Sequence, residues 1–326
     1  MPRRVDPNKK KQRRDWRWYA SFGLNAIVAL SMVLGSVVLF TGISTNRQIP
    51  TIEPPTAAPT LPSTVAPTLA PATAVPTLAP TVAPPTPTPK ASASDYTFAV
   101  AGDSRDGDAI YTKLLNSVMK DGSEFLIHTG DLVPSGSIEN WQNFQNLMKG
   151  FTLPFFPMPG NHELISNGKI SSYLKFSGAP TPTTNSQVTH YSFDRGAAHF
   201  TIVDSSTGSL MDSEFTWMDN DLDASHAPVK MVFVHHPPYD PAGTNHVMAN
   251  GGEKFMQIVK QRGAKYVFAG HIHCYEESDS DGVKYIITGG GGAPLTCPPA
   301  AGGFYHYIHV TMRGENVTMQ VVKIEE

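Results

Sequence analysis

Cysteine is scarce in this chain, because its 326 residues include only Cys274 and Cys297. Two cysteines exclude a fold whose framework is built from disulfides. An oxidising compartment would allow the pair to form one disulfide bond, but the sequence does not show whether the geometry permits it. The sequence therefore leaves this pairing open.

Charged residues are absent between Arg17 and Arg47. Within that interval, residues 18–43 form an apolar stretch longer than the ~20 residues that a membrane-spanning helix needs. The alternative is a cleaved signal peptide, whose apolar region is usually only about 7–15 residues long. The length favours an uncleaved transmembrane signal anchor.

Acidic residues are few in the N-terminal tail, residues 1–17, which holds eight Lys and Arg against two Asp. The positive-inside rule predicts that this basic tail stays in the cytoplasm, and Trp16, Trp18 and Tyr19 stand where an interfacial aromatic belt would lie. The rest of the chain is then predicted to lie outside the cytoplasm, on a single-pass protein of the cell membrane.

Charged residues are sparse and periodic apolar faces are lacking in residues 44–94, where Pro, Thr and Ala dominate and only Arg47, Glu53 and Lys90 are charged. This composition predicts a disordered or extended linker. At about 3.1 Å per residue in polyproline II, a fully extended linker would hold the remainder more than ~100 Å from the bilayer. Whether its Thr residues carry glycans or stay unmodified is left open.

Basic residues are the minority in the remainder: from Lys90 onward the chain has 16 Lys and Arg against 25 Asp and Glu. This acidic balance argues against nucleic acid as a partner. Residues 95–326 are predicted to form one domain, and they are numerous enough to bury a sizeable core.

Five short apolar runs in this domain each end in a polar residue suited to chemistry. They are residues 96–103, 124–131, 154–161, 229–236 and 264–271. They predict buried strands, and helical spacing of apolar residues in 108–120 and 252–262 predicts helices between them. Alternating patterns at 190–204 and 304–324 predict antiparallel hairpins. The predicted fold class is therefore α/β with mixed sheets.

The polar residues at the strand ends form a set of oxygen and imidazole ligands. The set comprises Asp103, Asp131, Asn161, His235, His271 and His273. Ligands in α/β sheets bind at the carboxyl ends of strands, so these residues are predicted to converge. Without thiolates they suit two divalent or trivalent transition metal ions such as Fe, Mn or Zn, which can clamp a phosphoryl group when about 3.5–4 Å apart. The Gly before four of them is interpreted as allowing a sharp turn at the strand end.

The ordered motifs GD, GD, GNHE, H and GHxH over residues 99–292 resemble the calcineurin-like metallophosphoesterases, which include the purple acid phosphatases and the catalytic subunits of Ser/Thr phosphatases. The resemblance implies two packed mixed sheets flanked by helices, a four-layer α/β/β/α sandwich. It assigns the first metal ion to Asp103 and His273, the bridging position to Asp131, and the second ion to Asn161, His235 and His271. A water or hydroxide held by the ions would attack phosphorus, while His162 would stabilise or protonate the leaving oxygen.

Two residues depart from the family pattern. Most members have GDxH, whose His completes the site of the first metal, whereas this chain has Arg105. Purple acid phosphatases have a Tyr ligand three residues after the bridging Asp, whereas this chain has Pro134. Arg105 suits phosphate oxygens and cannot bind a metal ion, so we expect a substrate contact there and a weaker first metal site. His162 also lacks the nearby Asp that often orients it.

Further histidines and one glycine run need an interpretation. His236 is predicted to point to the opposite face from His235 and to be structural. His246 stands where family members often have a substrate-contacting His, and the sequence leaves that role open. His128, His190, His199, His226, His306 and His309 are interpreted as structural. Residues 289–292, GGGG, predict a flexible loop at the edge of the site.

The sequence therefore predicts a membrane-anchored, extracytoplasmic phosphoesterase that acts on phosphomonoesters. The alternatives at the same site are a phosphodiesterase and a nucleotide pyrophosphatase. From other classes, a catalytically weak surface-binding protein would explain the missing His ligand and the long stalk, and a structural envelope protein would require the motifs to be coincidental. The sequence does not determine the oligomeric state.

Overall fold

The computed structural model describes residues 95–180, 189–241, 243 and 245–326 of the chain. The predicted basic tail, signal anchor and linker, residues 1–94, lie outside the described residues. Among the residues that are described, no helix combines the length and the apolar character needed to cross a membrane.

The first sheet has five strands in the order β11-β10-β1-β2-β3. They are β1 (Tyr96–Ala101), β2 (Leu126–His128), β3 (Phe155–Pro157), β10 (His306–Arg313) and β11 (Asn316–Lys323). Strands β1, β2 and β3 run parallel, whereas β10 pairs antiparallel with both β1 and β11. The parallel half brings three strand ends to one edge of the sheet.

The second sheet has six strands in the order β4-β5-β6-β7-β9-β8. They are β4 (Tyr191–Arg195), β5 (Ala198–Val203), β6 (Val229–Val234), β7 (Tyr266–Ala269), β8 (Tyr275–Ser280) and β9 (Val283–Thr288). The four central strands run parallel, and β4 and β8 close the two edges in antiparallel pairing. Both sheets are therefore mixed, as predicted.

Phenylalanine rings fill the space between the sheets. Phe98 of β1 stacks on Phe125 with 4.9 Å between ring centroids and meets Phe200 of β5 edge-on at 5.3 Å. Phe233 of β6 stacks on Phe268 of β7 at 5.0 Å. All five rings are buried. Burial of each such ring contributes roughly 1.5–3 kcal/mol, so this core fixes the two sheets against each other.

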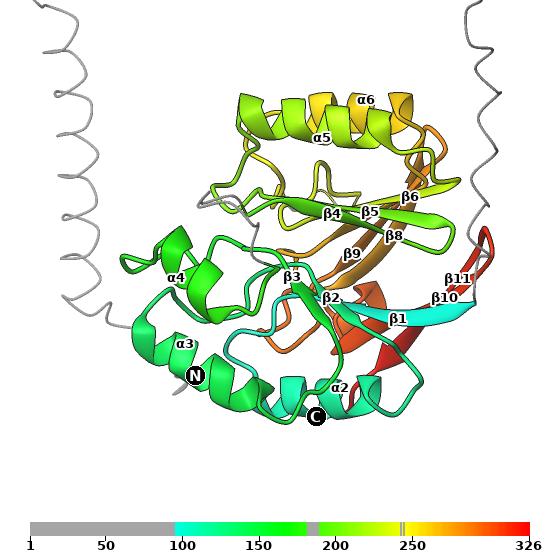
Figure 1. The fold of residues 1–326 in the computed structure, drawn as a ribbon. Coiled ribbons are helices and arrows are strands. Elements are labelled where there is room, and N and C mark those ends of the chain that lie inside the picture. Colours follow the sequence, from blue (N-terminus) through cyan, green and yellow to red (C-terminus); the bar gives the residue numbers. More distant parts are fainter. Residues whose placement is uncertain (1–94, 181–188, 242, 244) are drawn as a thin grey trace, which may run out of the picture. The chain divides into compact units, whose positions relative to one another are not determined.

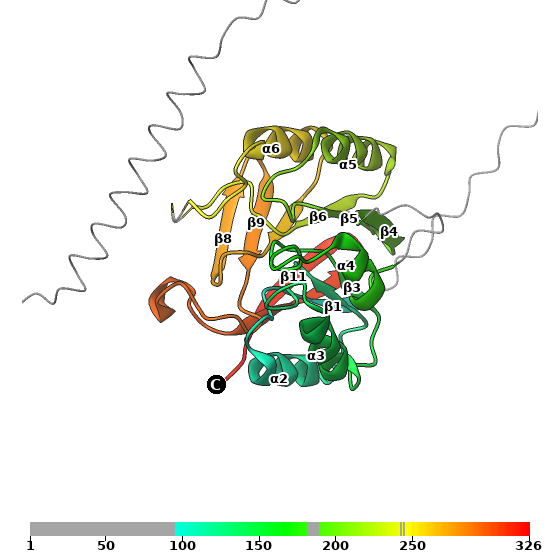
Figure 2. The same cartoon turned by 90° about the vertical axis from the view of Figure 1, so that its left-hand side faces the viewer.

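Helices cover the outer faces of both sheets. They are α2 (Asp108–Val118), α3 (Ile138–Met148), α4 (Ile170–Phe176), α5 (Asp212–Ala224) and α6 (Gly252–Gln261). Helices α5 and α6 lie side by side over the second sheet, and α2 and α3 lie against the first (Figures 1 and 2). The order of layers is helix, sheet, sheet, helix, in agreement with the predicted sandwich.

The predicted strands, hairpins and two helices are present, although the strands are shorter than the apolar runs. In the run 124–131, only Leu126–His128 pairs as a strand, because the polar end of the run leaves the sheet. Helices α3, α4 and α5 and the β8–β9 hairpin were not predicted. Helix α3 buries Trp141 and Phe144 at helical spacing, a pattern that the sequence interpretation missed.

Candidate metal centre

The predicted ligands come together at the carboxyl ends of five strands, three from the first sheet and two from the second. Asp103, Asp131 and Asn161 follow β1, β2 and β3, His235 follows β6, and His271 and His273 follow β7. Parallel strands deliver their ends to the same edge, which explains the convergence.

The first group of ligand atoms belongs to Asp103, Asp131 and His273. Their carboxylate oxygens and imidazole nitrogen lie within 4.8 Å of one another, and all three residues are buried. Nε2 of His273 lies 3.6 Å from Asp103 Oδ1. We call these three residues the first group.

The second group consists of Asp131, Asn161, His235, His236 and His271. Nε2 of His235 lies 3.1 Å from Asn161 Oδ1 and 3.3 Å from Asp131 Oδ1. Ring nitrogens of the three histidines lie within 4.8 Å of one another. Asp131 belongs to both groups, which is the position predicted for a bridging ligand.

His236 was predicted to point away from the site, and this prediction is wrong. Its ring centroid lies 4.1 Å from that of His271 and 4.8 Å from that of His235. Strand β6 ends at Val234, so the alternation of strand side chains no longer applies at His236. The His–His pair directly after a buried strand was the signal for an additional candidate ligand.

Backbone carbonyls fix the orientation of two candidate ligands. Nδ1 of His235 lies 2.8 Å from the Thr129 carbonyl oxygen, and Nδ1 of His273 lies 2.7 Å from the Pro294 carbonyl oxygen. A carbonyl can only accept, so each Nδ1 carries the proton and donates it. The Nε2 lone pairs of His235 and His273 consequently face the site, as metal-binding histidines require.

Burial keeps these imidazoles in the neutral form that binds metals. Burial, reinforced by the nearby His236, lowers the pKa of His235 well below its ordinary value. Burial also lowers the pKa of His271 to about 2 and shifts the pKa of His273 downward. In contrast, burial and the neighbouring charge of Asp131 raise the pKa of Asp103 well above its ordinary value. A bound cation would stabilise both carboxylates.

The second group fits a metal ion because it is a cluster of acceptors. The Nε2 lone pair of His235 faces Oδ1 of Asn161 and Oδ1 of Asp131 at contact distance. Three acceptor atoms cannot hydrogen-bond to one another, whereas a cation satisfies all of them at once. Imidazole nitrogen with carboxylate and amide oxygen suits Fe, Mn or Zn.

The sharp turns at the strand ends are made by the candidate ligands themselves. Asp103, Asp131 and His271 have φ angles of 59°, 58° and 68°. Left-handed backbone is uncommon outside glycine and concentrates at functional sites. The preceding glycines mainly provide space: a Cβ atom on Gly160 would lie 2.2 Å from Asp131 Oδ1. The interpretation that they provide the turns was incomplete for this reason.

Arg105 lies against the first group. Its Nε donates to Asp131 Oδ2 at 3.2 Å, and its Nη2 lies 3.4 Å from His273 Nε2. Its Nη1 donates to Asp106 at 2.7 Å. The side chain is only 16% exposed. A guanidinium therefore stands where the family motif has an imidazole, and its predicted contact with substrate stays a prediction.

His162 is oriented by two contacts that the sequence did not reveal. Its backbone N–H donates to Asp131 Oδ1 at 3.0 Å, and its Nδ1 donates to the Pro134 carbonyl at 2.7 Å. Its Nε2 faces Asp131 Oδ2 at 3.9 Å. Pro134 stands in the position of the Tyr ligand of purple acid phosphatases, and here its carbonyl holds the candidate acid in place.

Glu163, the last residue of GNHE, supports the site without facing it. Its fully buried carboxylate accepts backbone N–H groups of Asp131, Leu132, Val133 and Gly160 at 2.5–3.2 Å. Burial and the charge of Asp131 raise its pKa to about 8. The sequence interpretation gave Glu163 no role, although its place in the motif was a signal.

The GGGG run is buried and tied down, so its prediction as a flexible loop is wrong. Gly291 donates its N–H to the Gly102 carbonyl at 2.8 Å, and a Cβ atom on Gly291 would lie 2.4 Å from that oxygen. Ala293, which follows the glycine run, donates its N–H to the Asp103 carbonyl at 2.8 Å. Glycine is needed here because two backbone segments meet without space for side chains.

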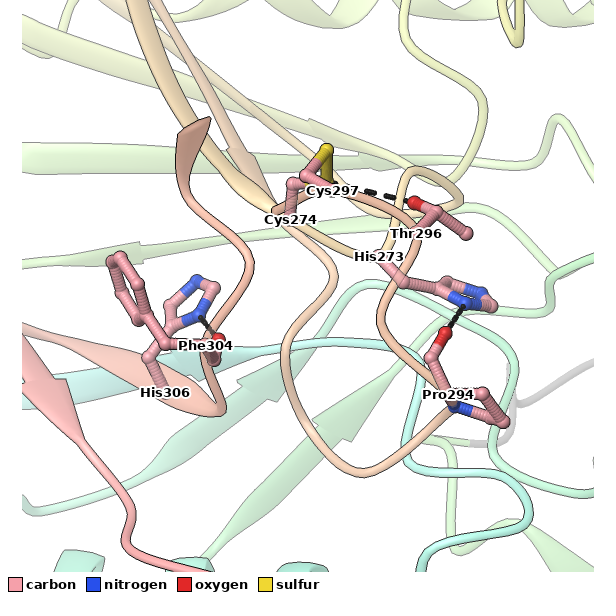
Figure 3. The surroundings of a disulfide bond; sticks show 7 residues. All are labelled: His273, Cys274, Pro294, Thr296, Cys297, Phe304 and His306. Carbon is pink, nitrogen blue, oxygen red and sulfur yellow. Dashed lines mark hydrogen bonds between the residues drawn. A yellow bond between two sulfur atoms is a disulfide. The ribbon is translucent and has the colours of Figure 1, made fainter. Parts of the chain in front are cut away.

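A disulfide joins Cys274 to Cys297, with 5.9 Å between their Cα atoms. Figure 3 shows it beside His273, whose ring reaches Pro294 on the same loop. Thr296 Oγ1 lies 3.5 Å from Cys274 Sγ. The disulfide therefore ties the loop that orients His273 to the strand that follows His273.

The other histidines fall into two classes. His246 is exposed, and its ring centroid lies 6.0 Å from that of His271, so its predicted substrate contact stays open. Several others bond to partners away from the two groups: His128 to Ser104, His190 to Glu214, His199 to Asp221, His306 to Phe304 and His309 to Asp121. These contacts agree with structural roles.

The comparisons with the sequences of known proteins find phosphoesterases. The model of the calcineurin-like phosphoesterases matches residues 96–275. A 3′,5′-cyclic-nucleotide phosphodiesterase of Nostoc sp. is 27% identical over 183 residues, which cover 53% of this chain and 63% of the relative. Purple acid phosphatase 21 of Arabidopsis thaliana is 29% identical over 220 residues, which cover 60% of this chain and 49% of the relative.

Solved structures show the same fold. A purple acid phosphatase from yellow lupin seeds superposes with a TM-score of 0.60 at 17% identity, over 73% of this chain and 52% of that chain. The chain spans about half to two thirds of the length of these relatives. Because the family model matches more than half of the chain, the protein belongs to the calcineurin-like phosphoesterase family.

Proposed function

We propose that this protein is a metal-dependent hydrolase of phosphomonoesters. The observation that carries the proposal is the convergence of five strand ends into two adjoining ligand groups that share Asp131. The family supports phosphoester chemistry, and buried neutral imidazoles beside buried carboxylates support metal binding.

The sequence predicted two ions, and the structure brings the residues predicted to bind them into two adjoining groups. The second group would hold one ion through Asn161, His235 and His271. The first group, with Asp103 and His273, was predicted to hold the other ion, and Arg105 also contacts it. A bound ion supplies Lewis acidity toward a phosphoryl oxygen and lowers the pKa of the attacking water. The carboxylate of Asp131, with one oxygen toward each group, holds the two halves in register.

His162 is the proposed general acid. Its Nδ1–H is committed to the Pro134 carbonyl, so Nε2 is the nitrogen that faces the site. A proton on Nε2 could pass to the leaving oxygen of the ester, a step that typically contributes 10²–10⁴-fold to rate. The short contact with Pro134 keeps the ring from turning away.

Two further side chains are proposed to contact the substrate. The guanidinium of Arg105 has donors beyond those used by Asp131 and His273, and its planar fork suits phosphate oxygens. His246 is exposed near His271 and could contact the part of the substrate that extends outward. Both roles come from the sequence interpretation and agree with the positions of these side chains.

A phosphodiesterase is the second candidate, because a cyclic-nucleotide phosphodiesterase is among the relatives with similar sequence. A nucleotide pyrophosphatase would need the same metal and leaving-group chemistry. The described residues include no feature that selects among monoester, diester and pyrophosphate.

We also propose that residues 18–43 anchor the protein in the cell membrane with its hydrolase domain, residues 95–326, outside the cytoplasm. The apolar length of 18–43 and the basic tail before it support this proposal. The disulfide between Cys274 and Cys297 adds support, because such bonds persist in oxidising compartments. Protease protection of the domain in spheroplasts would contradict it.

The function is tested by hydrolysis of p-nitrophenyl phosphate and bis(p-nitrophenyl) phosphate by the full-length chain, each with added Mn, Fe, Zn or Co. We expect faster turnover of the monoester and loss of turnover with chelator. Preference for the diester would replace phosphatase by phosphodiesterase. Background rates with every metal would favour a surface-binding protein that keeps the fold.

A further inference from the structure

Arg105 contacts the first group through the atoms that would bind a metal ion there. Its Nε donates to Oδ2 of Asp131, and its Nη2 lies 3.4 Å from Nε2 of His273. We propose that the Arg105 guanidinium is the resident cation of the first group, and that the chain retains one metal ion, in the second group. The inference rests on the proposed metal-dependent function and deepens it.

Arg105 already uses lone pairs on two of the three residues of the first group, Asp131 and His273. The Nδ1–H of His273 donates to the Pro294 carbonyl, so Nε2 holds its only free lone pair. Arginine can only donate, so the contact at Nε2 must use that lone pair. A metal ion in the first group would need the same lone pair and Oδ2 of Asp131. Arg105 and an ion therefore compete for this group.

The second group presents the opposite situation. Its acceptors, Nε2 of His235 and the Oδ1 atoms of Asn161 and Asp131, face one another, and Asp131 Oδ1 also accepts the backbone N–H of His162. Only Oδ2 of Asp131 faces Arg105, while Oδ1 faces His235. The two oxygens of this carboxylate thus separate a half-site occupied by a guanidinium from one that requires a metal ion.

Arg105 is also anchored from its other side. Nη1 donates to Asp106 at 2.7 Å, and the side chain is 16% exposed. A second ion would have to displace this anchored guanidinium or share space with its positive charge, and both are unfavourable. The chain further lacks the His that completes this half-site in most relatives, so an ion would gain only three ligand residues there.

The arrangement gives Arg105 a function in the reaction. A guanidinium carries a permanent charge at any physiological pH and can offer paired N–H donors to phosphate oxygens. It would stabilise the charge that develops on the phosphoryl group from the side where a second ion stands in a two-metal enzyme. One of the two positive charges that stabilise the phosphoryl group would then come from a side chain and the other from a metal ion.

The test counts metal ions and does not depend on turnover. The full-length chain is saturated with Mn²⁺, freed of loosely held ion by gel filtration, and analysed by elemental mass spectrometry and electron paramagnetic resonance. We expect one ion per chain with the signal of an isolated Mn²⁺. Arg105→His should restore the missing ligand and give two ions with a spin-coupled signal.

A matched variant separates the charge from the missing ligand. Arg105→Ala removes the competitor without adding a ligand, so we expect it to bind a second Mn²⁺ on the order of tenfold more tightly than the natural chain, and less tightly than Arg105→His. Circular dichroism of each variant checks the fold. If Arg105→His misfolds, the number of Mn²⁺ ions retained by the natural chain and the Mn²⁺ titration of Arg105→Ala still test the inference.

Two ions retained by the natural chain, or a second Mn²⁺ bound equally by the natural chain and Arg105→Ala, would overturn the inference. A chain with one ion that hydrolyses neither test ester would keep the inference and overturn the proposed function. A chain with two ions that hydrolyses the monoester would do the reverse. Retention of no ion would overturn both.

Discussion

The two sheets contribute different chemistry to the candidate metal centre. The first sheet delivers oxygen ligands, Asp103, Asp131 and Asn161, at the ends of three adjacent strands, and the second delivers only imidazoles. Each of the two ligand groups takes residues from both sheets. Neither sheet alone holds a complete site, so the aromatic core that fixes one sheet against the other also fixes the metal centre.

The electrostatics of the two sides differ in the same way. Burial raises the pKa of Asp103 on the first sheet and lowers the pKa of His235 and His271 on the second. Burial thus disfavours the charged form on both sides. A bound cation would offset the effect of burial on the carboxylates, because it stabilises their charged form. The imidazoles bind a cation in the neutral form that burial already favours. The carboxylates of the first sheet would therefore depend on a bound cation more than the imidazoles of the second sheet would.

The largest expected effect comes from removing the ligand that the two groups share. Asp131→Asn should lower turnover by on the order of 1,000-fold or more and release the bound metal, because its two oxygens face both groups. Turnover and metal content check this. Asp212→Asn is the matched control, because that carboxylate is fully exposed on α5. A variant that kept its metal would contradict the sharing of Asp131.

A smaller effect should distinguish two oxygen ligands of the first sheet. Asn161→Ala should weaken binding of the retained ion by at least about 100-fold, because Oδ1 of Asn161 belongs to the second group. Asp103→Asn should leave the count at one ion, because its carboxylate belongs to the group that Arg105 contacts. Calorimetric titration with Mn²⁺ measures both. Equal losses would show that the groups do not differ in affinity.

The disulfide permits a test on the second sheet alone. It links residues 23 apart, and closing such a loop stabilises by about 3 kcal/mol. Replacing Cys274 and Cys297 with Ser should lower the free energy of unfolding by that amount and weaken the hold of Pro294 on His273. Urea unfolding with and without reductant measures the effect. Reductant should not change the free energy of unfolding of the variant, whereas it should lower that of the natural chain.

The smallest effect concerns a His–Asp pair away from the metal centre. His199 lies between Asp194 and Asp221, at 2.6 and 2.9 Å. Burial lowers the pKa of His199, but these hydrogen bonds outweigh it and raise the pKa above 6.5. Burial raises the pKa of Asp221, but hydrogen bonds from His199, Ser192 and Thr201 outweigh it and lower the pKa below 3.8.

The signs of these shifts set the pH window. A raised His pKa adds stability that is complete below 6.5 and is lost as pH rises through the folded value. A lowered Asp pKa adds stability that is complete above 3.8 and is lost as pH falls through the folded value. Asp221→Asn should therefore cost about 1 kcal/mol at pH 5 and less at pH 9.

Urea unfolding at pH 5 and pH 9 checks this difference, with Asp279→Asn as the exposed control. A cost that does not change between the two pH values would contradict the charge-dependent pairing. A cost as large as that of removing the disulfide would show that the pair matters more to the second sheet than its partly exposed position suggests.

The amino-acid sequence alone was enough to predict the α/β class and the candidate ligands at the strand ends. Local patterns can be recognised without knowledge of the fold. Such patterns are the apolar runs that end in Asp103, Asp131, Asn161, His235 and His271. Parallel pairing then forces their ends to one edge. The motifs along the chain were therefore sufficient to predict that these five side chains would meet, although they did not predict that His236 would join them.

Only the tertiary structure decided how those side chains are held. Three features depend on backbone angles beyond the strand ends and on segments far apart in sequence. They are the approach of His236 to His271, the hydrogen bonds of Glu163 to the backbone of two loops, and the close contact of Gly291 with Gly102. The contact of Arg105 with His273 likewise joins residues 168 positions apart. Such contacts follow from how the two sheets pack, because no local pattern encodes the direction of a loop side chain.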